Sequence, residues 1–494
     1  MVDAAGRSFG RALTELASAR PDQANITLIA PDGTETDLSW AVLEARANQI
    51  AHRFAELGVT KDAVVALALP TCAEHILVTL AIWKLGAVLL PLRHDMPSWE
   101  MDRLLSLAEP TILVSDSHEA SIPVLTRDDL ARTAELDDRP LPDVVPDCVN
   151  YVASSGSTGS PKLIVTPRRG VVGADPDTAF FLSSGPATAL VVSPLYHVNG
   201  FAFAAPFALE GARVYVLEKF DAALAVDVIE RHRITLTVMV PTMLQRIARL
   251  SDIGTRNLRS LTRLVYGGAK VPDWVVDRWL ELIDPAAFLF TYGSSERLGF
   301  VAMTGLEWPE HRGSTGKPMD CRISIRDPDG RELPTGETGE IFLRSLEERP
   351  VFQYIGMPTP EPSADGYRSL GDLGWLDSDG YLYIADRRTD MIVSGGANVF
   401  PAEVEEALSE HPDVVDQVVV PVPDQEWGHR VHAIVQPRDP EQPPPPAELR
   451  AWCKARLAAY KAPRTFEFVA RMPRTEAGKL NRTALGTQRA DRDG

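Results

Sequence analysis

A run of small residues between two short apolar segments is the part of this sequence best suited to hold a phosphate chain. Segments 151–153 and 163–165 have the apolar pattern of strands, and the seven small residues 154–160, then Pro161 and Lys162, separate them. Such a loop offers backbone N–H groups and hydroxyls without bulky side chains, and the lysine adds a positive charge. Pro161 stands where the P-loop pattern requires its second glycine. We therefore predict a polyphosphate site of another kind, with a flexible hairpin tip as the alternative.

Three more segments place glycine, aromatic and polar residues directly after apolar runs. They are 193–201 (Ser-Pro-Leu-Tyr-His-Val-Asn-Gly-Phe), 266–269 (Tyr-Gly-Gly-Ala) and 291–296 (Thr-Tyr-Gly-Ser-Ser-Glu). Paired glycines let a flat ring or a backbone approach closely, and Glu296 offers the oxygen ligand that magnesium prefers. A single histidine such as His197 is more often structural. Each segment alone is typical of an ordinary turn, but the set favours one ligand site.

The chain around these loops alternates between predicted strands and predicted helices. The strands are expected at 64–69, 87–90, 111–114, 213–217, 236–240, 261–266 and 288–292, and the helices at 43–57, 76–86, 98–105, 222–231, 243–250 and 274–283. Strands that are apolar on both faces indicate a parallel sheet covered by helices on both sides. Ligands bind such α/β sheets beyond the carboxyl ends of the strands, where the three loops would lie.

The second part of the chain has a different texture. From about residue 313, short strands with Gly, Pro and Asp turns indicate a small β subdomain, and a dense charged cluster occupies 386–390. Further predicted helices (403–408 and 447–457) and strands (415–422, 431–435 and 466–469) follow this cluster. We therefore predict an α/β protein with a large domain at 1–387 and a separate α+β domain at 388–494.

Length, charge and cysteine spacing exclude several classes of protein. A chain of 494 residues is long for one hydrophobic core, and a net charge of −18 argues against nucleic acid and anionic membranes as partners. Lys84 and Gly86 interrupt the most apolar run, so we predict no membrane span. Four scattered cysteines and an N-terminus without a signal-peptide pattern predict a reducing, cytoplasmic setting.

These motifs, in this order, resemble the adenylate-forming (ANL) superfamily of acyl-CoA ligases, peptide-synthetase adenylation domains and luciferases. The resemblance covers nearly the whole chain and is carried by the Ser/Gly loop, the turn 292–296, Asp372, the cluster 387–390 and Gly478-Lys479. Residues 394–405 (Ser-Gly-Gly-Ala-Asn-Val-Phe-Pro-Ala-Glu-Val-Glu) resemble CoA ligases more than peptide-synthetase domains. Residues 161–164 and 307–314 look like the bile-acid and steroid CoA ligase branch.

The resemblance implies ATP, Mg²⁺ and CoA as ligands and a role for each matching residue. For ATP, the matching residues are Ser155, Thr158 and Lys162 (β- and γ-phosphates), Gly268, Ala269 and Tyr292 (adenine), Ser295 (α-phosphate), and Asp372 with Arg387 (ribose). Glu296 would bind the magnesium ion, and Lys479 would bridge the attacking carboxylate and the α-phosphate. The acid pocket would involve His197, Val198, Asn199, Phe201, Gly267, Arg297 and Gly299.

The implied reaction has two steps. A carboxylic acid attacks ATP to give an acyl-adenylate and pyrophosphate, and the thiol of CoA then displaces AMP. The resemblance implies that the small domain is mobile and rotates about the cluster 387–390 between the steps. The rotation would withdraw Lys479 and bring Gly395 and Gly396 to a pantetheine tunnel near His197, with Lys162, His197 and Lys479 as the catalytic residues.

The sequence departs from the usual pattern of this superfamily at several positions. Ser295 replaces a threonine, Leu163 replaces a glycine, and Thr389 stands where the hinge is usually Asp or Lys. Arg297 follows the magnesium glutamate directly: pointing outward it is a surface residue, and pointing inward it favours an acid with a second polar or anionic group. Asn199 argues in the same direction, against a plain long-chain fatty acid.

The leading prediction is an acid–CoA ligase for an aromatic, steroid-like or otherwise functionalised acid, with a homodimer as an open alternative to a monomer. A second hypothesis within the fold is an enzyme that passes the activated group to an amine or a carrier protein, or activates a small oxyacid such as nitrite. A third is a non-catalytic nucleotide-binding relative, against which the joint presence of Lys162, Glu296, Asp372, Arg387 and Lys479 argues.

Overall fold

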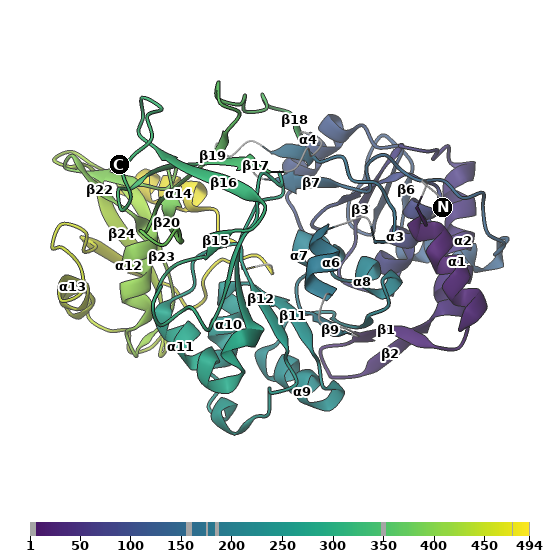
Figure 1. The fold of residues 1–494 in the computed structure, drawn as a ribbon, viewed down its shortest axis with the longest axis horizontal. Helices are drawn as coiled ribbons and strands as arrows, with labels where there is room; N and C mark the ends of the chain where they lie inside the picture. The colour runs from purple at the N-terminus through teal and green to yellow at the C-terminus, as the bar shows by residue number, and fades with distance from the viewer. Residues whose placement is uncertain are drawn as a thin grey trace.

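The structure is a computed structural model that describes residues 6–154, 161–173, 176–182, 187–346, 352–476 and 478–493. Its centre is a sheet in the order β15-β14-β13-β12-β11-β9-β10-β1-β2 (Figure 1). The bounds of these strands are Lys317–Pro318, Val301–Thr304, Phe288–Tyr292, Arg263–Tyr266, Leu236–Met239, Thr188–Val191, Arg213–Leu217, Ala24–Ile29 and Glu35–Ser39, respectively. The six inner strands β13, β12, β11, β9, β10 and β1 run parallel, whereas β2 at one edge and β14 and β15 at the other pair antiparallel.

Helices cover both faces of this sheet because its strands are apolar on both sides. In β10, Val214 and Val216 enter one hydrophobic core while Tyr215 and Leu217 enter the other. The first core contains α1 (Phe9–Ala19), α2 (Trp40–Glu56), α3 (Ala73–Lys84) and α8 (Ala205–Leu209), and the second contains α9 (Ala222–His232), α10 (Pro241–Ala248) and α11 (Asp273–Leu282). The predicted doubly covered parallel sheet is therefore confirmed.

Two smaller sheets complete the first part of the chain. A parallel sheet has the order β4-β3-β5-β6, with bounds Val88–Pro91, Val64–Ala68, Ile112–Ser115 and Val124–Leu125. An antiparallel sheet joins β7 (Tyr151–Ser154), β8 (Lys162–Val165) and the distant β18 (Gln353–Ile355). The short helices beside them are α4 (Ser98–Ala108), α5 (Arg127–Arg132), α6 (Pro176–Leu182) and α7 (Val198–Phe201).

The later part of the chain forms two more sheets. The first has the order β16-β17-β19-β20, with bounds Cys321–Arg326, Gly339–Ser345, Arg368–Leu376 and Leu382–Arg387. The second contains β22 (Ala397–Val399), β21 (Ile392–Ser394), β24 (Gly428–Pro437), β23 (Val414–Asp424) and β25 (Thr465–Phe468), with α12 (Pro401–Ser409), α13 (Pro446–Lys454) and α14 (Arg482–Asp493) packed near them. This green-to-yellow part lies at the opposite end of the molecule from α1 (Figure 1).

The loops singled out in the sequence lie where the sheet argument places them. Segment 193–201 follows β9, segment 266–269 follows β12, and segment 291–296 includes the end of β13, all at the carboxyl ends of parallel strands in the central sheet. The predicted small β subdomain corresponds to the sheet β16-β17-β19-β20. No helix among the described residues is long and apolar enough to cross a membrane.

The buried His75 on α3 makes acid stability testable. Only 1% of His75 is exposed, its Nε2 has no hydrogen-bond partner among the described residues, and burial lowers the pKa of His75 from 6.5 to about 3. Below pH 6.5 the imidazole of His75 is protonated in the unfolded chain but stays neutral in the folded chain. The free energy of unfolding therefore decreases as the pH falls from 6.5 towards 3. His75 can contribute up to about 1.4 kcal/mol of unfolding free energy per pH unit in this window.

We therefore expect His75→Leu to make the free energy of unfolding less dependent on pH between 7 and about 4.5. Urea denaturation followed by circular dichroism at several pH values measures this slope. Equal slopes in the two proteins would contradict the assignment of a neutral, buried imidazole.

Candidate active site

Asp372 on β19 is held between two partners that come from different sheets. Its Oδ2 accepts a hydrogen bond from the Tyr292 hydroxyl at 2.8 Å, and its Oδ1 accepts one from Arg387 Nε at 3.2 Å. Asp372 is 9% exposed and lies directly opposite Arg387 in the β19–β20 pair. Burial and then the Asp372 charge raise the pKa of Tyr292 well above its ordinary value, so its hydroxyl remains a donor.

A second polar group connects the β7–β8 hairpin to the loop after β13. Lys162 Nζ lies 3.9 Å from Glu296 Oε1 and 3.4 Å from the centroid of the Tyr354 ring. The Tyr354 hydroxyl donates a hydrogen bond to Glu296 Oε1 at 2.6 Å. Tyr354 belongs to β18, which pairs with β8 and so brings the tyrosine to the lysine. Burial lowers the pKa of Lys162, and the Glu296 carboxylate opposes this shift.

Arg387 joins the two groups electrostatically. Its positive charge adds to the lowering of the pKa of Lys162, and it also acts on Tyr292 and Tyr354. Its side chain is 61% exposed, so it faces the solvent-accessible side of the site. Lys162, Glu296 and Asp372, which are far apart in the sequence, therefore surround one region of the structure.

The glycines after β12 bring two loops into close contact. A Cβ on Gly267 would lie 2.7 Å from Thr291 Oγ1, and Gly268 has a φ of +95°, which favours glycine. The Thr291 hydroxyl donates to the Tyr266 carbonyl at 2.8 Å and fixes this spacing. Ala269 is exposed beside these glycines. The arrangement leaves a backbone edge without side chains, as a flat ring requires.

His197 caps the short helix α7 and is neutral at ordinary pH. Burial, followed by the charges of Lys479 and Arg93, lowers the pKa of His197 to about 3. Its neighbour Tyr196 donates a hydrogen bond to Glu476 Oε2 at 3.5 Å. This contact joins the loop after β9 to the last loop of the chain, which carries Lys479.

Lys479 lies at the same region as His197 and Arg387. Burial by the surrounding protein and then the charge of Arg387 lower the pKa of Lys479, although solvent still reaches part of the side chain. A Cβ on Gly478, whose φ is +75°, would lie 2.4 Å from Thr242 Oγ1 at the start of α10. The terminal loop thus packs tightly against the central sheet's helices.

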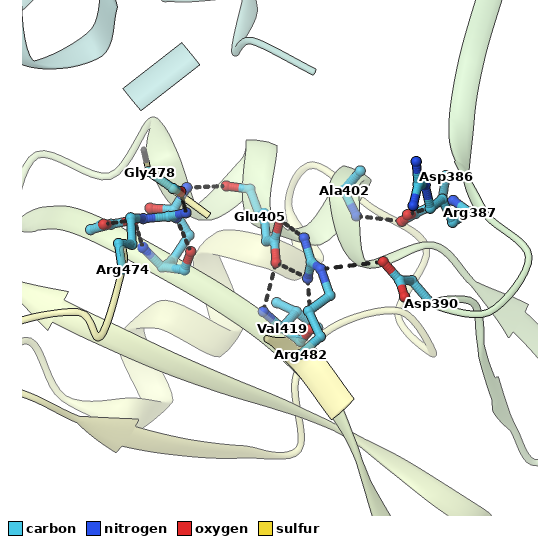
Figure 2. Close-up of polar contacts among 11 residues, drawn as sticks. Asp386, Arg387, Asp390, Ala402, Glu405, Val419, Arg474, Gly478 and Arg482 are labelled. Atoms are coloured by element: carbon cyan, nitrogen blue, oxygen red, sulfur yellow. Dashed lines mark hydrogen bonds and ion pairs between the residues drawn. The ribbon is translucent and has the colours of Figure 1, made fainter. Parts of the chain in front are cut away.

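Two arginines fix the terminal loop to the C-terminal sheet on either side of Lys479 (Figure 2). Arg474 donates to the Gly478 carbonyl at 2.9 Å and pairs with Asp416 at 2.6 and 2.7 Å. Arg482 pairs with Glu405 at 2.8 Å, donates to the Val419 carbonyl at 2.9 Å, and lies 3.6 Å from Asp390. We call these two arginines the loop clamp. The clamp therefore ties the backbone on both sides of Lys479 to β23, whereas the Lys479 side chain itself is exposed.

The charged cluster 386–390 is not simply a solvated loop. Asp386 accepts hydrogen bonds from the backbone N–H groups of Ala402 at 3.0 Å and Arg387 at 2.8 Å (Figure 2). Burial raises the pKa of Asp386 to about 6. Asp390 faces Arg482 of the loop clamp. The cluster therefore connects β20 to the start of α12 and to the terminal loop.

Gly395 and Gly396 form the turn between β21 and β22. Both have positive φ, +58° and +81°, as a two-residue hairpin turn requires. A Cβ on Gly395 would lie 2.3 Å from the Trp427 ring, and the Arg464 guanidinium lies over that ring, 3.8 Å from its centroid. Any side chain at 395 would displace the tryptophan.

Phenylalanines gather beside the predicted acid pocket. The Phe300 ring lies 5.5 Å from that of Phe180 and 6.3 Å from that of Phe181, and Phe181 lies 5.2 Å from Phe203. Phe203 and Asn199 lie against residues of β9 and the first residues of β11. Aromatic edges in this arrangement favour another flat, apolar ring.

The structure brings most of the predicted residues together. Tyr292, Glu296, Asp372, Arg387, Lys162, His197 and Lys479 surround one site, with Gly267, Gly268, Ala269, Ser295, Val198 and Asn199 on its loops. Ser155 and Thr158 lie outside the described residues. Phe201 is buried, and Arg297 takes a left-handed conformation with φ +57°.

Two predicted positions have a packing explanation. A Cβ on Gly299 would lie 2.5 Å from Cys321 Sγ, so close packing on β16 requires glycine there. Gly395 packs on Trp427 as described above. Their assignments to the acid pocket and the CoA tunnel stay predictions.

Several residues of the site were not found from the sequence. Tyr354 contacts Glu296, Tyr196 contacts His197 and bonds to Glu476, and Arg474 and Arg482 form the loop clamp. Tyr354 carries no motif, and only the pairing of β18 with β8 reveals it. The sequence shows that Arg474 and Arg482 stand on either side of Gly478-Lys479, but it does not show which groups they bind.

Comparisons with known proteins agree with this architecture. A model of the AMP-binding enzyme family matches residues 13–347, and one of the AMP-binding enzyme C-terminal domain matches residues 403–479. A feruloyl-CoA synthase from Amycolatopsis is 33% identical over 464 residues, covering 90% of this chain and 92% of that protein.

Solved structures with similar folds are also known. The o-succinylbenzoate CoA synthetase of Bacillus subtilis, in complex with its acyl-adenylate intermediate, is 28% identical with a TM-score of 0.77, covering 96% of this chain and 97% of that one. The amide bond synthetase McbA of Marinactinospora thermotolerans is 28% identical with a TM-score of 0.79, covering 97% and 99%. The extent of the family match, together with the enzyme-like clustering of lysines, carboxylates and tyrosines, shows that this chain belongs to the AMP-binding enzymes of the adenylate-forming superfamily.

Proposed function

We propose that the protein is an AMP-forming acid–CoA ligase. It activates a carboxylic acid with ATP to an acyl-adenylate and then forms a thioester with CoA, releasing AMP and pyrophosphate. The observation that carries this proposal is the convergence of Lys162, Glu296, Asp372 and Lys479 on one region. The relatives that are CoA synthetases support the same acceptor.

Different residues of the site would bind each part of ATP. Asp372 accepts hydrogen bonds from the ribose hydroxyls, with Arg387 beside it, and the edge at Gly268, Ala269 and Tyr292 frames the adenine. Lys162 and the loop 154–160 hold the β- and γ-phosphates, and Ser295 contacts the α-phosphate. Burial lowers the pKa of Lys162 although the Glu296 carboxylate opposes the shift, so a bound phosphate beside it would further favour the charged form.

The residues around Glu296 fit a magnesium ion. Its carboxylate offers hard oxygen ligands, and the neighbouring Ser294 Oγ is buried without a hydrogen-bond partner among the described residues. When bound, Mg²⁺ supplies charge neutralisation on the phosphates. Lys162 and Tyr354 would then keep the Glu296 carboxylate oriented towards them. Magnesium, a cytoplasmic location and a homodimer stay predictions.

The first half-reaction needs positive charge at the α-phosphorus. A carboxylate oxygen of the acid attacks this phosphorus, the new P–O bond forms, and the bond to pyrophosphate breaks with the electron pair on the leaving group. Negative charge concentrates between the acid and the α-phosphate in the transition state, and Lys479 is the cation that the terminal loop delivers there. The lowered pKa of His197 keeps its imidazole neutral, so this residue adds no charge beside Lys479.

The second half-reaction needs Lys479 to make room. The CoA sulfur attacks the acyl carbonyl, the tetrahedral intermediate collapses, and AMP leaves. We propose that residues 1–387 and 388–494 move relative to each other about the cluster 386–390, so that the Gly395-Gly396 turn approaches His197. The contact of Asp386 with the Ala402 N–H supports a hinge there, because it crosses the boundary between the two parts and would be exchanged in the rotation (Figure 2).

The proposed acid is aromatic or otherwise functionalised. The ring cluster of Phe180, Phe181, Phe203 and Phe300 favours a flat apolar body, and Asn199 beside Phe203 offers a polar contact. The feruloyl-CoA synthase relative supports a hydroxylated aromatic acid ahead of the steroid-like acid that the sequence also suggested.

Pyrophosphate exchange across a panel of acids tests the proposal. The panel contains hydroxycinnamic, benzoic, steroid and long-chain fatty acids, and a thioester assay with CoA follows for each acid that supports exchange. We expect exchange with aromatic acids and thioester formation with the same acids. If no acid in the panel supports pyrophosphate exchange, the proposed adenylation activity is wrong, and the non-catalytic hypothesis is favoured instead.

A second candidate function is amide synthesis, because the amide bond synthetase is as similar in fold as the CoA ligases. The same assay distinguishes the two. Exchange without a thioester, together with amide formation when an amine is added, favours this candidate. Nitrite belongs in the panel as the small oxyacid, and a carrier protein as the third acceptor.

A further inference from the structure

A cluster of contacts outside the ATP site joins the two parts of the chain. On one side lie Arg249 just past α10, Lys270 in the loop before α11 and Trp274 on α11. On the other side lie Glu406 and Ser409 on α12 and Val415 on β23. We call this cluster the docking patch. It is separate from the hinge cluster 386–390 and from the terminal loop, although all three connect the same two parts.

Arg249 at the end of α10 makes the most buried contacts of the patch. Its guanidinium donates to the carbonyls of Val415 and Ser409, the second at 3.2 Å, and lies 5.1 Å from the centroid of the Trp274 ring. Burial, followed by the charge of Arg438, lowers the pKa of Arg249 to about 10. A guanidinium gives up its hydration only where fixed acceptors replace water, so these bonds hold the two surfaces in one register.

Trp274 and Lys270 add directional contacts on α11 and the loop before it. The Trp274 indole N–H donates to Ser409 Oγ at 3.3 Å, and the Ser409 hydroxyl donates to the Glu406 carbonyl at 2.7 Å. Lys270 Nζ pairs with Glu406 at 2.7 Å. Burial and the Glu406 carboxylate raise the pKa of Asp273 to about 6, which shows that two carboxylates share the field of Lys270.

The position of the patch connects it to Lys479. Thr242 at the start of α10 contacts Gly478 of the terminal loop, whereas Arg249 lies just past the end of the same helix, about 10 Å away at 1.5 Å per residue. One short helix thus touches the C-terminal part at both ends. The loop clamp ties the loop that carries Lys479 to β23, and Arg249 contacts Val415 on the same strand, so fixing β23 at Arg249 also fixes where this loop lies.

We propose that the docking patch positions Lys479 in the site, by holding the C-terminal sheet in the orientation in which the acid is adenylated. This inference rests on the proposed function. Arg249, Lys270, Trp274 and Glu406 are therefore positioning residues, which act on the chemistry through Lys479. The patch must separate before the thiol can attack, so weakening it affects the two half-reactions differently.

Charge reversal at the Lys270–Glu406 pair is the sharpest test. Lys270→Glu places a third carboxylate beside Glu406 and Asp273, and we expect pyrophosphate exchange to fall about tenfold, because like charges in direct contact repel. Thioester formation from pre-made acyl-adenylate should be unchanged or faster. The double variant Lys270→Glu with Glu406→Lys restores the pair and should recover most of the exchange activity.

Arg278→Glu is the matched control, because Arg278 also lies on α11 and pairs with Glu281 at 2.6 Å but within its own helix. We expect it to leave the ratio of the two half-reactions unchanged. Trp274→Phe removes the indole donor while keeping an aromatic ring, and should lower exchange in the same direction as Lys270→Glu. Thermal melting of every variant checks folding.

The outcomes separate this inference from the proposed function. If the wild-type enzyme shows no acid-dependent exchange, the proposed function itself fails. If the wild type is active but Lys270→Glu lowers both half-reactions equally, or the charge swap restores nothing, the docking patch has no positioning role. A selective loss of exchange that the swap restores supports the inference.

Discussion

Replacing Lys479 with alanine is expected to lower acyl-adenylate formation by about a hundred- to a thousandfold, the usual effect of losing one preorganised donor at a developing charge. The fall should appear in kcat of pyrophosphate exchange rather than in the KM for ATP, because Asp372 and Lys162 hold the nucleotide independently. Thioester formation from pre-made acyl-adenylate should continue at nearly the wild-type rate. Separate assays of the two half-reactions measure this division.

Lys461→Ala is the control for Lys479→Ala. Lys461 also lies in the C-terminal part and forms an ion pair with Glu403 at 2.6 Å, away from the ATP site. It should leave both half-reactions intact. An equal loss of both steps in Lys479→Ala would show that the lysine is structural.

The second large effect is expected at Asp372. Asp372→Ala removes the acceptor of two ribose hydroxyls, and hydrogen bonds to a charged group contribute about 1.5–3 kcal/mol, so the KM for ATP should rise by about ten- to a hundredfold or more. The variant also leaves the half-buried Tyr292 hydroxyl without its acceptor, which costs about 1–3 kcal/mol of folding free energy. Steady-state kinetics over a range of ATP concentrations and a denaturation curve measure the two effects.

Asp372→Asn distinguishes binding from folding at this position. The amide keeps the size of the side chain and can still accept from Tyr292, so stability should be nearly restored while the KM for ATP stays raised. If the KM of Asp372→Asn equals that of the wild type, the carboxylate is not the ribose acceptor, and its part in the site is only to order Tyr292 and Arg387.

The sequence was informative where a pattern reports local structure. Predicted strands 213–217 and 288–292 coincide with β10 and β13, because apolar runs between turn residues fix both the type and the length of a strand. The three loops at the sheet's carboxyl edge followed from strand direction alone. Boundaries such as that of α10, which begins at Pro241 and not at 243, shifted because proline favours the first turn of a helix.

Features that depend on distant pairing could not be predicted. The strands β1, β2 and β9 were missed, and β9 holds the middle of the central sheet between β10 and β11. Tyr354 reaches Lys162 only because β18 crosses to β8 from far along the chain. The terminal segment is too polar to predict α14 from its own pattern. The helix depends on Leu485, which packs into a small core that β23 and β24 provide.

Residue types in the sequence indicated which side chains could form the site, but not which other residues contact them. Glu296, Asp372 and Lys479 lie in one region as predicted, and their roles stay predictions, but several of their partners come from distant parts of the chain. The docking patch has no motif at all, because its strongest bonds go to the backbone carbonyls of Val415 and Ser409. Carbonyl acceptors look the same at every position of a sequence.

The loop clamp has a consequence for the timing of catalysis. Since Arg474 and Arg482 bind Lys479's loop to its own sheet, the lysine cannot leave by a quick flip of a few residues. In the cycle proposed above, its departure is the rotation of the whole C-terminal part through water, a motion on the order of microseconds to milliseconds. If this rotation and not the chemical step is rate-limiting, kcat should decrease as the viscosity of the solvent increases.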